Sequence, residues 1–166
     1  MMLACAVSAC TPTLDWREVR PGGSGLQALF PCKPDAHARR VPLGGTSVEL
    51  TLHACSAGGA TYAVAFADVG QAQFVAPALA ALAAAAVRNI DAHGTAETLP
   101  AHIAGMTPNA QASRQRLVGR LNDGQAVEEQ VAVFARGTQV YQATMVGARL
   151  DADSIEMFFG ALRLPA

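Results

Sequence analysis

Histidine, cysteine and serine side chains could give this chain metal binding or nucleophilic chemistry, but their spacing supports neither. The histidines stand apart, near a predicted turn, on a predicted strand, at a helix end and in a loop: His37, His53, His93 and His102. None belongs to a zinc motif such as His-Glu-x-x-His, and the chain has no Gly-x-Ser-x-Gly elbow, P-loop or dinucleotide fingerprint. We therefore expect no metal, no cofactor and no enzyme activity, and we expect each histidine to be a surface or capping residue.

Cys10 follows a short sequence that resembles a bacterial lipobox. In Val7-Ser8-Ala9-Cys10, one aliphatic and two small residues precede the cysteine. The resemblance implies that Cys10 receives a diacylglyceryl group, that the segment before it is removed as a signal peptide, and that the new N-terminus is acylated. Cys5 is a poorer candidate, because Met2 would occupy the aliphatic position. As a structural element, residues 1–9 would instead be a short apolar helix with no polar face and no cap.

The predicted signal peptide, residues 1–9, lacks a basic residue at its front and has a short apolar run. We therefore expect the signal to begin upstream of Met1. A protein anchored in this way would lie in the cell envelope, facing the periplasm. Thr11 rather than Asp follows the cysteine, which favours the outer membrane by analogy with enterobacterial sorting. Residues 10–25 are polar and end in a Pro, Gly and Ser run, so they are predicted to be a tether, with Trp16 docked on the domain.

Cys32 and Cys55 remain after Cys5 leaves with the signal and Cys10 carries lipid. An even number of cysteines in an oxidising compartment indicates a disulfide. The bridge would close a loop of about 24 residues and stabilise the fold by roughly 3 kcal/mol, and it can form if the strands beside the two cysteines are neighbours. Two free buried thiols are the alternative. A zinc site is disfavoured, because His53 and Cys55 are the only closely spaced pair of ligands.

The composition is that of a single globular domain. The 166 residues are 51% hydrophobic and 15% charged, which is enough to bury roughly two thirds of the unfolded surface. The formal net charge of -1 leaves no basic excess for binding to phosphates. We therefore expect one domain at residues 26–166 and no nucleic-acid partner.

The first half of this domain predicts strands followed by a helix. Three segments are rich in strand formers: residues 26–30, 48–54 and 61–66. The turn signal at residues 56–59 joins the last two as a hairpin. Residues 74–91 are predicted to be an Ala-rich helix with Gly94 as its C-cap. Its apolar run, about 14 residues with a proline, falls short of the about 20 that cross a bilayer, so we expect a helix packed on a sheet.

The second half predicts an antiparallel meander, after an irregular segment at residues 103–110. Apolar and polar residues alternate over residues 113–121, and Asn122-Asp123-Gly124 forms the first turn. The register that buries the apolar side chains puts Leu117 opposite Glu129, and it puts Val127, Val131 and Val133 on the core face. Arg136-Gly137 forms the next turn, before a third strand at residues 140–146.

Three arginines share the other face of the first meander strand: Arg114, Arg116 and Arg120. The same register places Glu128 and Gln130 beside them. The simplest interpretation is a solvated face whose cross-strand charge pairs contribute about 0.2 to 1 kcal/mol each. The alternative is a contact site for an anionic partner, since arginine donates bidentate hydrogen bonds to anionic oxygens.

A second helix is predicted at the end of the chain. Asp153-Ser154-Ile155-Glu156 has the form of a capping box. Four apolar side chains at helical spacing predict a face packed on the sheet: Ile155, Phe158, Phe159 and Leu162. The predicted fold class is therefore α+β, an antiparallel sheet packed against the Ala-rich helix and this C-terminal helix.

The order of these elements, together with four short sequence phrases, resembles the PsbP-like fold. The phrases are residues 30–34, 62–68, 140–141 and 158–164. This fold occurs in an extrinsic photosystem II subunit, in a Ran-binding nuclear protein and in bacterial envelope lipoproteins of the DcrB type. The resemblance covers about residues 26–164. Members are mainly binding or assembly proteins without a shared catalytic set, so the resemblance assigns no functional residue.

Three classes of function remain after these expectations. The first is a binding or assembly module, held in the membrane by an N-terminal lipid anchor, that contacts an envelope protein or a cell-wall component. The second is a carrier that holds a small ligand between the sheet and the Ala-rich helix. The third is a hydrolase whose site is assembled only by folding. A flat exposed patch would favour the module, a roomy apolar cavity the carrier, and clustered titratable groups in a cleft the hydrolase.

Overall fold

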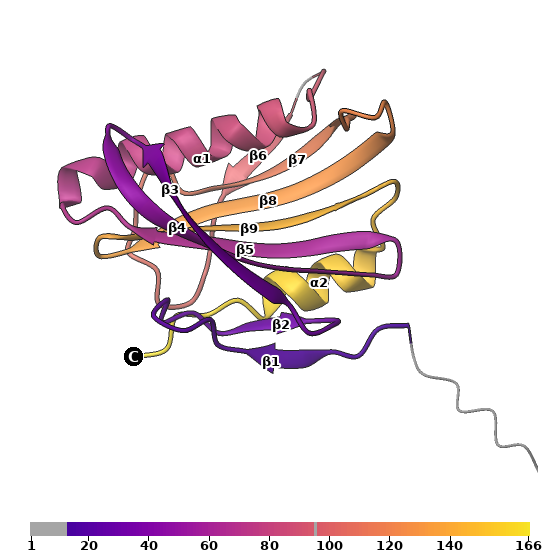
Figure 1. Ribbon diagram of the computed structural model, residues 1–166, viewed down its shortest axis with the longest axis horizontal. Coiled ribbons are helices and arrows are strands. Elements are labelled where there is room, and N and C mark those ends of the chain that lie inside the picture. The colour runs from indigo at the N-terminus through magenta and orange to yellow at the C-terminus, as the bar shows by residue number, and fades with distance from the viewer. Residues whose placement is uncertain (1–12, 95) are drawn as a thin grey trace, which may run out of the picture.

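Strands dominate the part of the chain that the computed structural model describes, residues 13–94 and 96–166. Seven strands form one antiparallel sheet in the order β3-β4-β5-β9-β8-β7-β6 (Figure 1). Their bounds are β3 Asp35–Leu43, β4 Thr46–Ala57, β5 Ala60–Asp68, β6 Glu97–Pro100, β7 Ser113–Arg120, β8 Ala126–Arg136 and β9 Gln139–Gly147. Two further strands, β1 Arg17–Val19 and β2 Ala28–Phe30, form a separate antiparallel pair. The predicted α+β class is therefore confirmed in its antiparallel sheet and its two helices.

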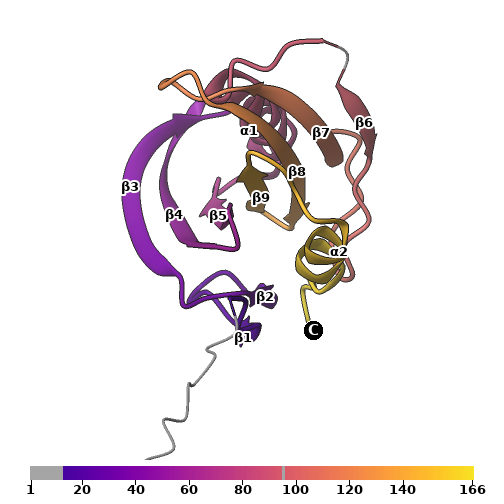
Figure 2. The ribbon, with the colours of Figure 1, turned by 90° about the vertical axis from the view of Figure 1, so that its right-hand side faces the viewer.

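The sheet is curved, and β4 is longer than the strands on either side of it. All of β3 pairs with the first nine residues of β4, whereas β5 pairs only with the last seven, from Thr51 to Ala57. The start of β4 therefore extends past β5, together with the part of β3 that pairs with it. Figure 2 shows β3 and β4 on one side and β7 and β8 on the other, both rising around helix α1 (Val75–Asn89). We call this inner side of the sheet the α1 face.

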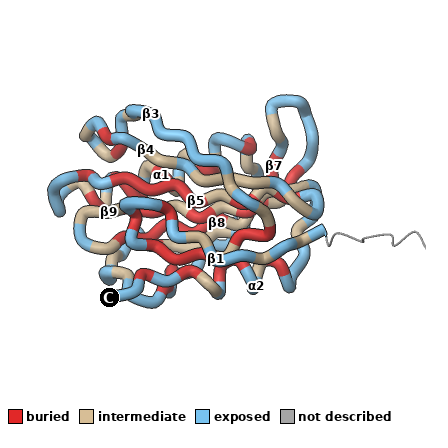
Figure 3. The backbone as a smooth tube through the Cα atoms, turned by 60° about the horizontal axis from the view of Figure 1, so that its bottom comes forward, coloured by how far each residue is buried: buried red, intermediate tan, exposed pale blue. Residues whose placement is uncertain are grey.

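The outer side of the sheet, which we call the α2 face, is covered by helix α2 (Ala152–Gly160) and by the β1–β2 pair. Strand alternation sends successive side chains to the two faces, so each face has its own apolar cluster. On the α2 face, Phe158 packs edge to face on Tyr62 and on Phe30, with ring centroids 5.4 Å and 5.6 Å apart. In Figure 3, buried residues are concentrated in β5, β8 and β9, whereas β3 is largely exposed.

Two glycines let α1 approach the backbone of the sheet at both of its ends. A Cβ at Gly44, in the β3–β4 turn, would lie 2.5 Å from the backbone nitrogen of Ala78, and a Cβ at Gly119 would fall on the carbonyl oxygen of Ile90. The same carbonyl accepts a hydrogen bond from the backbone N–H of Arg120. The helix is therefore held across the α1 face, from the β3–β4 turn to β7.

By length and composition alone, the segment Ala72–Asn89 could cross a membrane; it comprises a short 3₁₀ helix (Ala72–Phe74) and α1, and it is longer than the apolar run considered from the sequence. In the structure, α1 packs on the sheet through five buried side chains: Val75, Ala78, Leu79, Leu82 and Ala86. The expectation that this is a helix packed on a sheet is therefore confirmed.

The disulfide between Cys32 and Cys55 is present, with Cα atoms 6.0 Å apart. Cys32 lies between β2 and β3, and Asp35 at the start of β3 pairs with Ala54 of β4, so the chain arrives beside Cys55. The strand before Cys32 is β2, which is not a neighbour of β4. The bridge therefore fastens the β1–β2 pair to the large sheet.

The predicted tether is wrong for the part of it that the structure describes, residues 13–25. Its middle forms β1, and the Trp16 ring packs edge to face on Tyr62 with centroids 5.8 Å apart, as expected for a docked tryptophan. Ser24 is buried, and its carbonyl oxygen accepts a 2.6 Å hydrogen bond from the Tyr141 hydroxyl. These contacts make the segment part of the fold. The predicted signal peptide and Cys10 lie outside the described residues.

Both predicted helix caps are displaced. The C-cap of α1 is Ile90 rather than Gly94: Asp91 has a positive φ of 44°, and the backbone N–H of Ala92 donates to the carbonyl of Val87. This is a Schellman-type end with aspartate in the position that glycine usually takes. At the start of α2, the cap is Asp151 rather than Asp153, and its carboxylate accepts a 2.9 Å hydrogen bond from the backbone N–H of Ser154. That bond holds the pKa of Asp151 below its usual value.

Candidate ligand-binding pocket

A pocket of about 520 Å³ opens on the α1 face, beyond the C-terminal end of α1. The helix covers only part of this face: Asn89 and Ile90 at its end line the pocket together with residues of β3, β4, β5, β8 and β9. Apolar side chains from four elements and one loop form most of the wall: Leu50, Leu52, Ala65, Ile90, Leu121 and Val146. Cavities of roughly 300–1,000 Å³ with such walls hold small organic molecules in other proteins.

The pairing of the strands explains both the space and the polar groups on its floor. One row across the sheet runs from His37 through Leu52 and Ala65 to Gln142, and in the next row Ala63 pairs with Thr144. The side chains of Ala63 and Ala65 on β5 end at Cβ. The middle of each row therefore has little side-chain volume above the sheet. Gln142 and Thr144 therefore face open space instead of apolar side chains.

Glu129 is the most unusual side chain of the pocket. It is 3% exposed and lies between the buried Val127 and Val131 on β8. The predicted register is confirmed, since Leu117 pairs with Glu129. Its carboxyl group has no hydrogen bond or ion pair with any residue in the part of the chain that the structure describes. Burial without a partner raises its pKa to about 7.

The other polar groups of the pocket differ in how many of their hydrogen-bonding atoms already have a partner within the protein. Nε2 of Gln142 donates a 3.2 Å hydrogen bond to the hydroxyl of Thr144, which leaves the Gln142 carbonyl as an acceptor. His37 and Arg39 are exposed on β3, at the rim of the pocket. Asn89, at the end of α1, also lines it. Glu129 is therefore the single acidic side chain among the lining residues.

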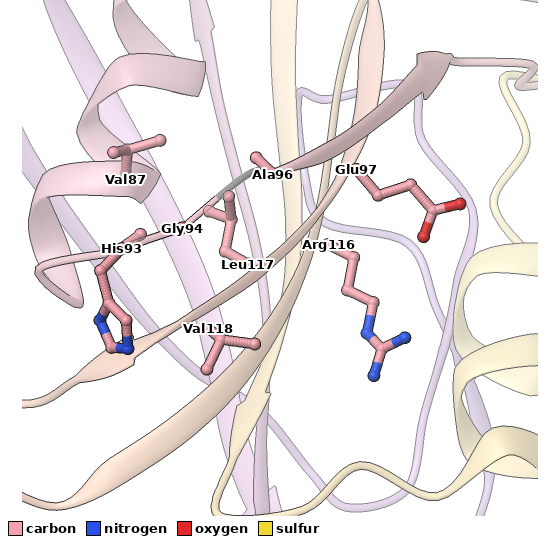
Figure 4. A pocket seen from close by; sticks show the side chains of 9 residues that line it. Val87, His93, Gly94, Ala96, Glu97, Arg116, Leu117 and Val118 are labelled. Atoms are coloured by element: carbon pink, nitrogen blue, oxygen red, sulfur yellow. The ribbon is translucent and has the colours of Figure 1, made fainter.

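A smaller hollow of about 280 Å³ lies on the other side of the α1 end, between α1, β6 and β7 (Figure 4). Its titratable side chains, His93, Glu97 and Arg116, are exposed. Figure 4 shows them projecting from three different segments without converging on one point. Because none of the described residues that line this hollow is a buried polar group, we take the larger pocket as the candidate site.

The three predicted arginines share one face of β7, opposite Ala132, Gln130 and Ala126 of β8. Two of them are engaged within the protein. The guanidinium of Arg114 lies 4.4 Å from the centre of the Phe159 ring, and Arg120 donates a 3.1 Å hydrogen bond to the carbonyl of Gly124. Arg116 is exposed beside the smaller hollow. The pairing thus confirms the shared face, while its role as a contact site stays a prediction.

The four histidines do not come together. His53 is on β4, as predicted, and stacks on Phe66 with centroids 6.2 Å apart; burial lowers its pKa. His93 follows α1 and His102 lies in a loop, both exposed, whereas His37 is the third residue of β3. Within residues 13–94 and 96–166, no three His, Cys, Asp or Glu side chains form a group that could hold a metal.

Glu129 was not among the predicted site residues, although the sequence contains a signal for it. The register that buries Val127 and Val131 necessarily buries the glutamate between them, and a buried carboxyl is a frequent mark of a functional site. Gln142 and Thr144 interrupt the core face of β9 in the same way. His37 and Arg39 could not be identified as pocket residues from the sequence, because β3 was not predicted. The strand is largely exposed on both faces and so lacks the alternation of apolar and polar residues.

A comparison of the chain with protein-family models found no match, and a comparison with curated proteins found none either.

Proposed function

We propose that this protein is a binding protein of the bacterial cell envelope that holds a small, largely apolar ligand in the pocket on the α1 face. The observation that carries the proposal is the pocket itself. It combines about 520 Å³ of space, mainly apolar walls and a few polar groups on the floor, which is the usual composition of a small-molecule site. Of the three classes that the sequence left open, a roomy cavity favours the carrier.

Catalysis has less support from the same residues. A hydrolase needs a nucleophile within hydrogen-bond reach of a base. The hydroxyl of Thr144 receives its hydrogen bond from the amide of Gln142, and no hydrogen bond joins it to Glu129 or to His37 in the described part of the chain. We therefore assign the pocket to binding and give the protein no catalytic role.

The envelope location rests on the sequence before Cys10. A lipid on Cys10 would place the folded domain at the membrane surface, facing the periplasm, and the Cys32–Cys55 disulfide agrees with an oxidising compartment. The antiparallel sheet with two helices is compatible with the PsbP-like fold that the sequence phrases resemble. We propose membership of that fold, whose members mainly bind or assemble other molecules.

Assembly with an envelope protein or a cell-wall component is the second candidate. Arg116 supports it, because its side chain is exposed, whereas Arg114 and Arg120 already contact Phe159 and Gly124. A partner that binds this face would be recognised by one arginine rather than by three.

The test of the proposed function is a search for a molecule that stays with the protein. The protein is purified from the envelope of its native host, and small molecules released on unfolding are identified by mass spectrometry. We expect one small molecule in wild type and its loss in Ala63→Trp, which fills the pocket, and in Leu52→Arg, at a wall position that is 37% exposed. Ala84→Trp, on the exposed side of α1, is the matched control. The same extracts from all four proteins would refute a pocket ligand.

A further inference from the structure

We propose that the ligand of this pocket is an apolar amine whose ammonium group binds beside Glu129. This inference rests on the proposed function and names the chemical class of the ligand. It depends on one feature that a purely apolar pocket would lack: a carboxyl group, buried in the fold, that faces the cavity and has no partner in the described part of the protein.

The burial of Glu129 without a partner is the first step of the argument. A buried carboxylate normally pairs with a base or accepts several hydrogen bonds, because leaving it unpaired costs several kcal/mol. Here the side chain is 3% exposed and is surrounded on β8 and its neighbours by Val127, Val131, Leu117 and Val146. An occupant of the pocket is the group that could supply the missing partner.

The charges around Glu129 form the second step. Among the lining residues, β4, β5, β9 and α1 contribute no charged side chain. The other titratable and charged groups, His37 and Arg39, are exposed on β3 at the rim, and neither forms an ion pair with Glu129. In the sheet, β3 and β8 are separated by β4, β5 and β9. The floor of the pocket is therefore acidic, and its basic groups stay in water.

The hydrogen-bonding groups of the floor form the third step. An ammonium group has three donors and no acceptor. Glu129 provides a carboxylate, and Gln142 and Thr144 provide a carbonyl and a hydroxyl oxygen as further acceptors. The apolar walls, with Leu50 and Ile90 among them, would cover a hydrocarbon or aromatic body. A primary amine on such a body would donate hydrogen bonds to the acceptors of the floor and pack its apolar part against the walls. An anionic head group would instead be repelled by the carboxylate of Glu129.

Three probes that differ only in the head group test this assignment: 4-phenylbutylamine, 4-phenylbutanol and 4-phenylbutyrate. Their affinities for the ligand-free full-length protein are measured by isothermal titration calorimetry at pH 8. We expect the amine to bind at least tenfold more tightly than the alcohol and the carboxylate. Glu129→Gln should remove this preference, because it keeps the shape and loses the charge. Glu128→Gln, one residue away on the opposite face, should retain it.

The outcomes separate the inference from the proposed function. Equal affinities for the three probes, abolished together by Leu52→Arg, would leave the pocket as a ligand site and overturn the amine. Tighter binding of the carboxylate would overturn it in favour of an anion held at the rim by Arg39. Preference for the amine that survives Glu129→Gln would also overturn it. If no probe binds wild type while a pocket-dependent molecule is recovered from the envelope, the assignment of an amine ligand is wrong. The proposal that the pocket binds a ligand is then still supported.

A pH series gives a second readout. Protonation of Glu129, with a pKa raised to about 7 by burial, would remove the charge that pairs with the ammonium. Between pH 8 and pH 5.5, the affinity for 4-phenylbutylamine should therefore fall roughly 30-fold. Histidine also gains charge in this range, so the fall must persist in His37→Gln. A fall that is lost in His37→Gln and kept in Glu129→Gln would assign the effect to the rim and contradict the inference.

Discussion

The two faces of the same sheet are built differently. On the α2 face, α2 and the β1–β2 pair cover an apolar cluster in which the Phe158 ring packs on Phe30 and Tyr62, with ring centroids 5.6 Å and 5.4 Å apart. On the α1 face, one Ala-rich helix packs on an apolar cluster, and the pocket beyond its end is lined by Glu129, Gln142 and Thr144.

The difference assigns separate tasks to the two faces. A closed aromatic cluster contributes stability, since each large ring buries much apolar surface. A buried carboxyl without a partner lowers stability, and such a cost is commonly found at functional sites. The α2 face therefore contributes stability, whereas the unpaired Glu129 lowers stability on the α1 face, where the proposed ligand site lies.

The largest effect that this comparison predicts is on the α2 face. Phe158→Ala removes the ring that is 0% exposed and contacts Phe30, Tyr62 and Phe159. We expect the free energy of unfolding, measured by urea denaturation, to fall by about 3 to 5 kcal/mol. The affinity of the folded fraction for a pocket ligand should stay within about twofold, because the ring is on the other side of the sheet. A large change in affinity with little change in stability would reverse the assignment of the two faces.

The next effect is the pH dependence of Glu129. In the unfolded chain its pKa is near 4.5, and burial raises it to about 7 in the folded protein. The folded state therefore holds the proton more tightly, so stability from this group is full below about pH 4.5, falls as the pH rises to about 7, and stays low above that. We expect the free energy of unfolding of Glu129→Gln, relative to ligand-free wild type, to rise by about 3 kcal/mol from pH 4.5 to pH 8.

Urea denaturation at several pH values measures this difference directly. The subtraction removes the other carboxyl groups, which titrate equally in both proteins. Glu128→Gln is the control, because its side chain is on the α2 face of the same strand. A flat difference for Glu129→Gln would mean that the carboxyl group is paired or solvated in the folded protein, and the comparison of the two faces would lose its main support.

A smaller effect is expected where α1 meets β7. In Gly119→Ala, the added methyl group would fall on the carbonyl of Ile90, at the end of α1 that borders the pocket. The helix end must shift, and we expect a loss of about 1 to 3 kcal/mol in thermal or urea unfolding. Gly22→Ala is the control, because nothing lies within 4 Å of its added methyl group. If the stability of Gly119→Ala is unchanged, the end of α1 is more adaptable than the hydrogen bonds of Ile90 and His93 suggest.

Helix α2 and the meander were predictable from the sequence because they depend on local patterns. Alternating apolar residues fixed the pairing of Leu117 with Glu129, and helical spacing identified Phe158 and Phe159 as core residues. The pocket was not predictable, because it depends on two features without a local pattern. One is the exposed strand β3, and the other is the curl that brings β3 and β8 to the same cavity.

The smallest effect on stability is predicted at Arg116, which points away from both clusters. Its side chain is exposed on β7, across from Gln130, and it has no ion pair among the described residues. Arg116→Glu should therefore leave the melting temperature almost unchanged. Its free energy of unfolding should stay within about 0.5 kcal/mol of that of wild type, as for most surface substitutions.

The same variant distinguishes a solvated surface from a docking surface. If this side of β7 contacts an anionic partner, Arg116→Glu should lose that partner from an envelope pull-down, and wild-type binding should weaken as salt rises, because exposed charges are screened. Arg114→Glu is a stricter comparison: its guanidinium packs on Phe159, so this variant should lose stability even if no partner exists. Equal recovery of partners with wild type and Arg116→Glu at low salt would leave the pocket on the α1 face as the binding site to pursue.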